Sequence, residues 1–153
     1  MLLYVAGQGS LREDLENQVR SMGMEGRVKF LGLRRDVPRL LAAADGFVLA
    51  SAWEGLPNVV MEALAASIPV VATRVGGVPE LVLDGKSGFT VPPKDPDALA
   101  QAMLRLMALP REIRFRMGQT GRAYVEAHYG LENVVNQWEK LFLECLRGRG
   151  IPV

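Results

Sequence analysis

Five short apolar segments, separated by longer helical patterns, constrain the fold of this chain more than any other feature. Each is bounded by glycine, proline or polar residues, and the five lie at residues 2–6, 28–31, 46–50, 70–73 and 89–91. Short apolar runs of this kind are typical of strands buried on both faces of a parallel sheet, with the helical segments as crossovers. The pattern therefore predicts an α/β fold, a Rossmann-like parallel sheet with helices on both faces.

Signals for the ends of helices lie between the apolar segments. Ser10 followed by Glu13 forms a capping-box pattern, so Ser10 is expected to cap a helix at about residues 11–22. Asp36 and Pro38 mark a second helix start, as a cap and a first-turn proline. Further helices are expected at residues 58–66, 96–106, 110–125 and 131–146, with a helical turn at 81–83.

Length and composition indicate one globular domain. The chain has 153 residues, 49% hydrophobic and 23% charged, which is sufficient for a hydrophobic core. The net charge of +1 gives no reason to expect nucleic acid or an acidic membrane as a partner. A single cysteine, Cys145, excludes an internal disulfide and a multi-cysteine zinc site and fits the reducing cytosol. No apolar run approaches the roughly 18 residues that span a bilayer, so no membrane span and a cytoplasmic location are expected.

The segment at residues 51–69 carries the strongest functional signal. Its helix, predicted at residues 58–66, is apolar almost all round and is therefore expected to be buried. Glu62 is unusual there, because an unpaired carboxylate in a buried helix is costly and needs a cation, several donors or a polar ligand. Asn58 lies one turn earlier on the same face, and Glu54 lies in the loop just before the helix. Two carboxylates therefore flank the start of this helix.

This arrangement suits a nucleotide sugar. Free backbone amides and the dipole at the start of a helix favour a phosphate, and carboxylates accept hydrogen bonds from sugar hydroxyls. A capped, buried helix with one satisfied core glutamate fits the same spacing equally well. Spacing alone leaves both interpretations open.

Several loops follow the carboxyl ends of predicted strands, where parallel sheets bind ligands. They are expected to converge on one rim and comprise residues 7–10, 32–36, 51–58 and 73–80. The pair Gly7 and Gly9 lacks the third glycine of a dinucleotide fingerprint, because position 12 is Arg12, so a tight turn before a helix is the favoured interpretation. Arg34 and Arg35 would stand on this rim, where a contact to a base or a phosphate is one interpretation.

Other distinctive side chains carry less specific signals. Trp53 fits either the wall of a pocket beside Glu54 or an anchor in the core. Trp138 is expected in the core or at a domain contact, and the basic run at residues 111–116 is expected to form a solvated helix face. His128 is the sole histidine of the chain, so a histidine metal cluster cannot form.

A series of short motifs runs through the chain in order, at residues 7–12, 28–32, 44–48, 54–62, 69–73, 76–80 and 84–93. In this order the chain resembles the donor-binding C-terminal domain of a group 1 (family 4) retaining glycosyltransferase of the GT-B fold. The decisive element is the pair Glu54 and Glu62, separated by seven residues as in the family's E-x7-E motif. The resemblance identifies residues 1–153 as a nucleotide-sugar-binding C-terminal domain, with C-terminal helices at about 95–147.

The resemblance implies a role for each part of the site. Glu54, the candidate catalytic residue, would touch the hydroxyls of the donor sugar, and Glu62 would bind those of the ribose. Loop amides would approach the sugar and diphosphate, and the loop after Gly32 would contact the base. Members of this family generally need no metal or cofactor and stabilise the leaving diphosphate with basic side chains and helix dipoles. The expected substrate-binding residues are Gly7, Gly9, Leu33, Arg34, Glu54, Gly55, Leu56, Pro57, Asn58, Val59 and Glu62.

Two parts of the family pattern are absent from this chain. The family's Arg and Lys for the diphosphate precede the position where the chain begins, and the N-terminal acceptor-binding domain, an expected partner, is missing. The chain opens inside a strand pattern, which predicts a truncation that removes the first strand. By family topology that strand would lie between residues 2–6 and 46–50. These two are therefore expected either to pair directly or to leave an exposed edge prone to self-association.

The resulting prediction is the donor-binding domain of a retaining glycosyltransferase that transfers a sugar from a nucleotide diphosphate sugar to an acceptor. The fragment alone is expected to be inactive, and peripheral association with a membrane would depend on the absent domain. A nucleotide-binding or interaction module without catalysis is one alternative, favoured by the missing basic loop. A nucleotide-sugar epimerase of similar fold is another, which the spacing of Glu54 and Glu62 disfavours.

Overall fold

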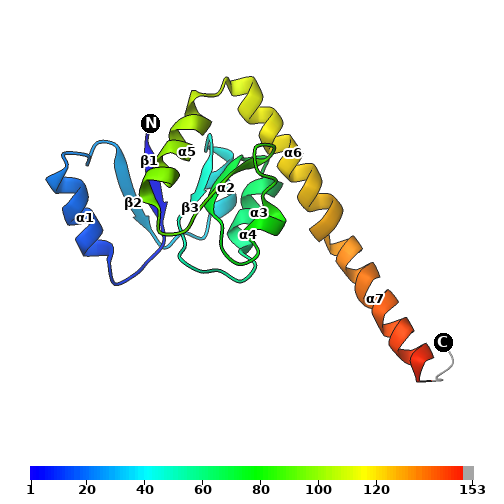
Figure 1. The fold of residues 1–153 in the computed structure, drawn as a ribbon. Helices are drawn as coiled ribbons and strands as arrows, with labels where there is room; N and C mark the ends of the chain where they lie inside the picture. The colour runs from blue at the N-terminus through cyan, green and yellow to red at the C-terminus, as the bar shows by residue number, and fades with distance from the viewer. Residues whose placement is uncertain (150–153) are drawn as a thin grey trace. The chain divides into compact units, whose positions relative to one another are not determined.

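The computed structural model describes residues 1–149 of the chain. They divide into two compact units, residues 1–40 and the residues from 41 onward, and the short helix α2 (Val37–Ala42) spans the boundary. Strands and helices alternate through both units (Figure 1), and every strand runs parallel to the strand with which it pairs. The predicted α/β class with parallel, helix-flanked sheets is therefore confirmed.

The first unit is a strand–helix–strand module. β1 (Leu3–Ala6) pairs in parallel with β2 (Val28–Gly32), and α1 (Arg12–Ser21) connects the two strands. All three elements lie within one or two residues of their predicted positions. Gly23 follows α1 with a φ of 64° and ends it, because its amide and the next one bond back to carbonyls of the last turn.

The start of α1 differs from the prediction. The residue before its first turn is Leu11, and no side chain caps the helix. The amide of Arg12 donates to the carbonyl of Gly9, at 3.2 Å, in a backbone turn that precedes the helix. This turn moves the helix start forward, so Ser10 stands one residue too early to be the cap. The predicted capping box is therefore wrong.

The second unit contains a three-stranded parallel sheet. Its strands are β3 (Phe47–Leu49), β4 (Val70–Thr73) and β5 (Gly88–Val91), in the spatial order β3-β4-β5. β4 is buried at every residue, as expected for a central parallel strand. Of the two alternatives expected for residues 2–6 and 46–50, direct pairing is not observed, because β1 and β3 pair with different strands in separate sheets, and self-association through an exposed edge stays a prediction. Within residues 1–149, β3 bonds to a strand on one side only.

Five further helices belong to the second unit: α3 (Asn58–Ala65), α4 (Val78–Leu81), α5 (Pro96–Ala108), α6 (Arg111–Tyr129) and α7 (Leu131–Gly148). The predicted turn at 81–83 is displaced, since α4 begins directly after Gly77 and closes with a bond from the Val82 amide to the Val78 carbonyl. The sheet, α5 and α6 share one hydrophobic core, whose buried members are Val71, Phe89, Val91, Ala102, Leu106 and Met117.

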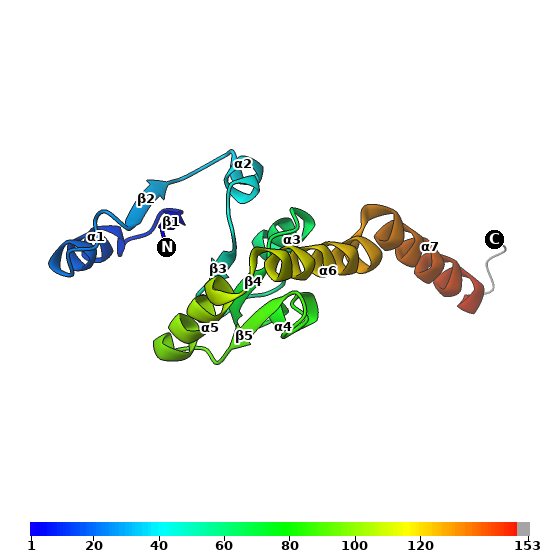
Figure 2. The same cartoon turned by 90° about the horizontal axis from the view of Figure 1, so that it is seen from above.

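Two glycines of α6 allow this helix to lie close against α3 and the turn that follows it (Figure 2). A Cβ at Gly118 would overlap the backbone carbonyl of Ser67, and a Cβ at Gly121 would collide with the side chain of Leu64. Close backbone approach of this kind leaves no space for a larger residue. α3 is therefore held in a fixed position relative to α6.

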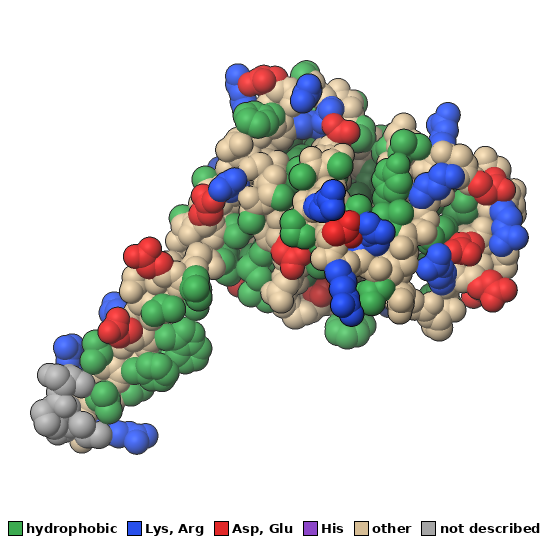
Figure 3. Space-filling model, turned by 180° about the vertical axis from the view of Figure 1, so that it is seen from behind, with side chains coloured by type: hydrophobic (Ala, Val, Ile, Leu, Met, Phe, Trp, Pro, Cys, Tyr) green, Lys and Arg blue, Asp and Glu red, His purple; other side chains and the backbone are tan. Residues whose placement is uncertain are grey.

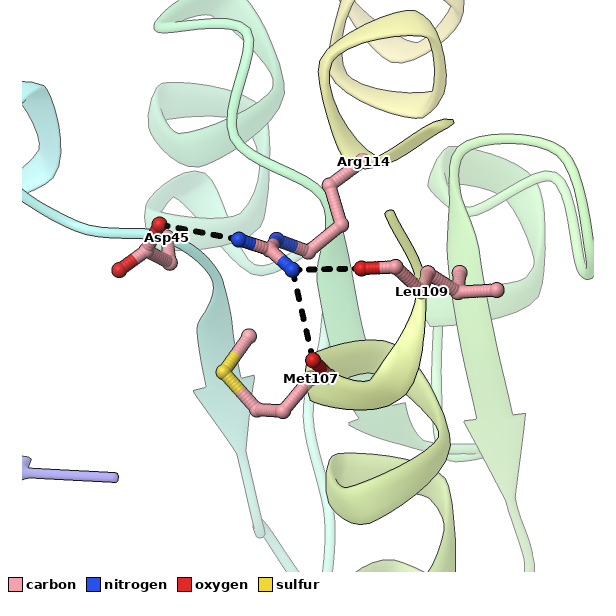
Figure 4. A network of polar contacts seen from close by, with 4 residues as sticks. All are labelled: Asp45, Met107, Leu109 and Arg114. Carbon is pink, nitrogen blue, oxygen red and sulfur yellow. Dashed lines mark hydrogen bonds and ion pairs between the residues drawn. The ribbon is translucent and has the colours of Figure 1, made fainter. Parts of the chain in front are cut away.

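Arg114 links the end of α5 to Asp45, two residues before β3 (Figure 4). Its guanidinium donates to the carbonyls of Leu109 at 2.7 Å and Met107 at 3.4 Å, and it lies 3.4 Å from a carboxylate oxygen of Asp45. These bonds satisfy carbonyls that the end of a helix leaves free. The expected solvated face at residues 111–116 is therefore wrong for Arg114, whose side chain is only 18% exposed.

α7 exposes an apolar stripe. No residue of this helix is buried, and hydrophobic side chains lie uncovered along one side of it (Figure 3). Trp138 is 55% exposed and contacts Phe142, with ring centroids 5.6 Å apart, so a place in the core is wrong, and a domain contact stays a prediction. Among the described residues, no helix has the length and hydropathy to cross a membrane.

Candidate functional site

The loop between β3 and α3 is fixed by two side-chain hydrogen bonds. The Ser51 hydroxyl donates to Oε1 of Glu54 at 2.6 Å. The hydroxyl of Thr73, at the end of β4, donates to the Ser51 carbonyl at 2.6 Å. Thr73 is 4% exposed, while Ser51 and Glu54 are half-buried. The Glu54 carboxylate is therefore held at the carboxyl end of the sheet, where such folds bind ligands.

A second loop, which follows β4, supports the first. The amide of Gly77 donates to the carbonyl of Gly55 at 2.6 Å. A Cβ at Gly76 would overlap the carbonyl of Glu54, and a Cβ at Gly77 would collide with the side chain of Leu56. Gly76 has a φ of 49°, a value that residues with a side chain rarely adopt. The structure thus brings together two of the four predicted rim loops, 51–58 and 73–80.

The N-terminus of α3 is open. Pro57 occupies the position before the helix and provides no side-chain cap. The amides of Asn58 and Val59 have no hydrogen-bond acceptor within residues 1–149. The first turn contains no acidic residue. An anion could therefore accept hydrogen bonds from these amides and interact favourably with the helix dipole.

Glu62 lies on the exposed side of α3, which corrects the prediction of a buried helix. Only Val60, Ala63 and Leu64 of this helix are buried, whereas Asn58 and Glu62 are exposed. The eight-residue helix covers the core with one face, although its opposite face is also largely apolar. Glu62 therefore needs no partner for stability. In the described part of the chain its carboxylate makes no ion pair or hydrogen bond, so it is free to bind a ligand.

Trp53 lies in the same loop as Glu54 and is 83% exposed. An anchor in the core is excluded by this exposure. Trp53 therefore presents its indole to the surface, directly beside Glu54 in the sequence.

The candidate residues of the first unit gather at the carboxyl end of β1 and β2. Gly7 has a φ of 141°, and its amide donates to the carbonyl of Gly32 at 2.9 Å, which joins the two loops. Gly9 lies in the turn before α1, and Leu33 is 65% exposed just after Gly32. Each unit thus carries one cluster of predicted site residues.

Arg34 is engaged by a neighbouring carboxylate. Its guanidinium makes two bonds to Asp36, with Nε–Oδ1 at 2.8 Å and Nη2–Oδ2 at 2.6 Å. These bonds raise the pKa of Arg34 and lower the pKa of Asp36. The Asp36 carboxylate therefore binds Arg34, and the predicted capping of α2 by this side chain is not observed.

Ser51 and Thr73 are the polar residues of the site that the sequence analysis did not identify. A serine three residues before an acidic residue in a loop could have suggested the bond from Ser51 to Glu54. The bond from Thr73 joins the end of β4 to the loop after β3. It therefore depends on the pairing of these two strands, which sequence spacing does not reveal. No group of three His, Cys, Asp or Glu side chains that could hold a metal ion occurs in residues 1–149.

Residues 1–108 match the family model of glycosyl transferases group 1. The N-acetyl-alpha-D-glucosaminyl L-malate synthase of Bacillus anthracis is 32% identical over 145 residues, which cover 95% of this chain and 38% of that protein. The lipopolysaccharide core biosynthesis glycosyltransferase LpsE of Rhizobium meliloti is 32% identical over 139 residues, which cover 91% of this chain and 41% of that protein. The chain thus spans about two fifths of the length of these curated relatives.

Solved structures of similar proteins show the same fold. Sucrose-phosphate synthase from Thermosynechococcus elongatus superposes with a TM-score of 0.83 at 28% identity and is covered to 39%, with 95% of this chain aligned. Anabaena Alr3699/HepE, solved in complex with UDP, superposes with a TM-score of 0.85 at 27% identity and is covered to 41%, with 94% of this chain aligned. The expected relation to GT-B glycosyltransferases is confirmed, and the chain belongs to the group 1 glycosyl transferases.

Proposed function

We propose that this chain is the donor-binding part of a retaining glycosyltransferase that moves a sugar from a nucleotide diphosphate sugar to an acceptor. The observation that carries the proposal is the placement of Glu54 and Glu62 on either side of the open N-terminus of α3. Phosphate oxygens suit the free amides, and sugar hydroxyls suit the two carboxylates. The structure of Anabaena Alr3699/HepE with UDP-glucose, from a protein 28% identical to this chain, supports a ligand of this class.

The two carboxylates have different tasks in this proposal. Glu54 accepts hydrogen bonds from the donor sugar, and Glu62 accepts them from the ribose. The amides of Asn58 and Val59 bind the diphosphate between them. Leu33 and Arg34, which belong to the first unit, are the candidates for a contact to the base, and Leu33 offers an exposed apolar surface for it. The chain spans about two fifths of the length of these relatives, and transfer itself is proposed for the parent protein, with the acceptor bound outside this donor site.

Calorimetry on this chain tests the proposal. UDP, GDP, ADP and their sugars are titrated into the wild type and into Glu62→Ala, with circular dichroism to establish that both are folded. Binding of one nucleotide, weakened at least tenfold by Glu62→Ala, is the expected result, since a lost hydrogen bond to a charged group costs about 1.5–3 kcal/mol.

A matched control is Glu144→Ala, which removes another exposed glutamate, from α7. This variant should bind as the wild type does. Failure of a folded wild-type chain to bind any nucleotide or nucleotide sugar would contradict the proposal and favour an interaction module that has lost the site.

A further inference from the structure

The contact between Ser51 and Glu54 is a short side-chain bond to one of the two proposed ligand-binding carboxylates. The Ser51 hydroxyl donates to Oε1 of Glu54 at 2.6 Å, a length typical of a bond from a hydroxyl to a charged oxygen. Within residues 1–149, Oε2 of Glu54 has no partner. One oxygen is therefore held by the protein, and the other is available.

The backbone that carries Ser51 is itself fixed. Thr73 donates its hydroxyl to the Ser51 carbonyl at 2.6 Å, and Thr73 is almost fully buried at the end of β4. β3 and β4 are paired in register up to Leu49 and Ala72, next to these residues. The position of the Ser51 hydroxyl is thus set by the central strand of the sheet.

The backbone of Glu54 is fixed from the opposite side by the loop after β4. The Gly77 amide donates to the Gly55 carbonyl at 2.6 Å, and Gly76 lies against the Glu54 carbonyl so closely that a Cβ would not fit. The remaining freedom of Glu54 lies in its side-chain torsions. Among the described residues, Ser51 is the one that restrains them.

We propose that Ser51 is a positioning residue, which holds the Glu54 carboxylate in the rotamer that directs its free oxygen toward the donor sugar. This inference rests on the proposed function and deepens it. A carboxylate accepts from several hydroxyls, and fixing one oxygen leaves the lone pairs of the other for the sugar. A side chain already held in its binding rotamer does not lose rotamer freedom when the sugar binds, so the affinity for the sugar rises.

The alternative is a purely local role, in which Ser51 stabilises the loop and has no effect on sugar recognition. The two roles differ in one measurable respect. Loss of a loop bond would weaken binding of the nucleoside diphosphate and of the nucleotide sugar alike. Loss of Glu54 positioning would weaken binding of the nucleotide sugar alone, since the nucleoside diphosphate lacks the donor sugar that Glu54 binds.

Calorimetry on the whole chain distinguishes the two roles. The probes are UDP and UDP-glucose, replaced by the corresponding GDP or ADP pair if one of those is the ligand that binds wild type. Ser51→Ala should lower the affinity for the nucleotide sugar about fivefold to tenfold, the effect of one hydrogen bond. The affinity for the nucleoside diphosphate should stay unchanged. Ser51→Thr keeps the hydroxyl and should restore most of the affinity. In a Glu54→Gln background, Ser51→Ala should add less than twofold, because the two residues act as a unit.

Equal weakening of both ligands, or no weakening of either, would overturn the assignment of Ser51. If wild type binds neither ligand, the proposed function fails, and Ser51 is then tested without any ligand. Side-chain scalar couplings of Glu54, measured by NMR, should report one rotamer in the wild type and averaging in Ser51→Ala. Averaging already present in the wild type would overturn the positioning role.

Discussion

Ser67 occupies a backbone position that glycine would fill better. It follows α3, and its amide donates to the Leu64 carbonyl at 2.9 Å while the amide of Ile68 donates to the Ala63 carbonyl at 2.9 Å. This pair of bonds defines a helix end whose central residue must be left-handed, and Ser67 has a φ of 61°. Its hydroxyl is buried and has no hydrogen-bond partner in the described residues. Replacing Ser67 by glycine should therefore stabilise the protein.

The magnitude follows from three contributions. Relief of the left-handed conformation contributes about 1–2 kcal/mol. Removal of the unsatisfied hydroxyl contributes about 1–3 kcal/mol. The greater freedom of glycine in the unfolded chain opposes these gains by about 0.5–1 kcal/mol. The expected net gain is about 2 kcal/mol in the free energy of unfolding, or an increase in Tm of roughly 4–8 °C.

Urea unfolding followed by circular dichroism measures this difference, and Ser67→Ala separates its sources. Alanine also removes the hydroxyl but keeps a Cβ at the same positive φ, so it should be less stable than the glycine variant by about 0.5–1 kcal/mol, the strain relieved minus the freedom that glycine adds to the unfolded chain. A glycine variant no more stable than wild type would refute the reasoning. An alanine variant as stable as the glycine variant would show that the relief of backbone strain does not exceed the entropic cost of glycine in the unfolded chain.

Two further predictions concern the packing around the sheet. Gly118→Ala should lower the free energy of unfolding by more than about 2 kcal/mol in urea titrations, because its Cβ would overlap the backbone carbonyl of Ser67 and force α6 away from α3. Burial raises the pKa of Tyr129, aided by Tyr124 and Glu80. The folded chain therefore holds the Tyr129 proton more tightly than the unfolded chain does. The resulting contribution to the free energy of unfolding is present below about pH 10 and is lost as the pH rises through the folded pKa. Tyr129→Phe should reduce the fall in stability seen in unfolding curves between about pH 9 and 11.

The strands could be predicted from the sequence because burial on both faces leaves a simple mark. The apolar run at residues 70–73 is identical to β4, and the run at 89–91 differs from β5 by one residue. The positions of the two carboxylates at the start of α3 could be predicted too, since they depend only on where a strand ends and a helix begins.

The failures have physical causes that spacing does not carry. The sequence predicts that Glu62 lies in a buried helix, because apolar residues occur on both sides of α3. Only three residues of α3 are in fact buried. Ser10 does not cap α1, because a backbone turn that begins at Gly9 moves the cap position one residue beyond it. The hydrogen bond from Thr73 to the Glu54 loop depends on which strands are neighbours. Contacts between segments distant in the sequence thus decide the details of the site.

The division of labour between Glu54 and Glu62 tests the central claim most directly. UDP and UDP-glucose, or the nucleotide pair that wild type prefers, are titrated calorimetrically into Glu54→Gln and Glu62→Gln. Glu62→Gln should weaken both ligands by about tenfold or more, because both contain the ribose, whereas Glu54→Gln should weaken the nucleotide sugar alone. Unchanged binding in both variants, or equal effects of Glu54→Gln on the two ligands, would contradict a donor site built on these two carboxylates.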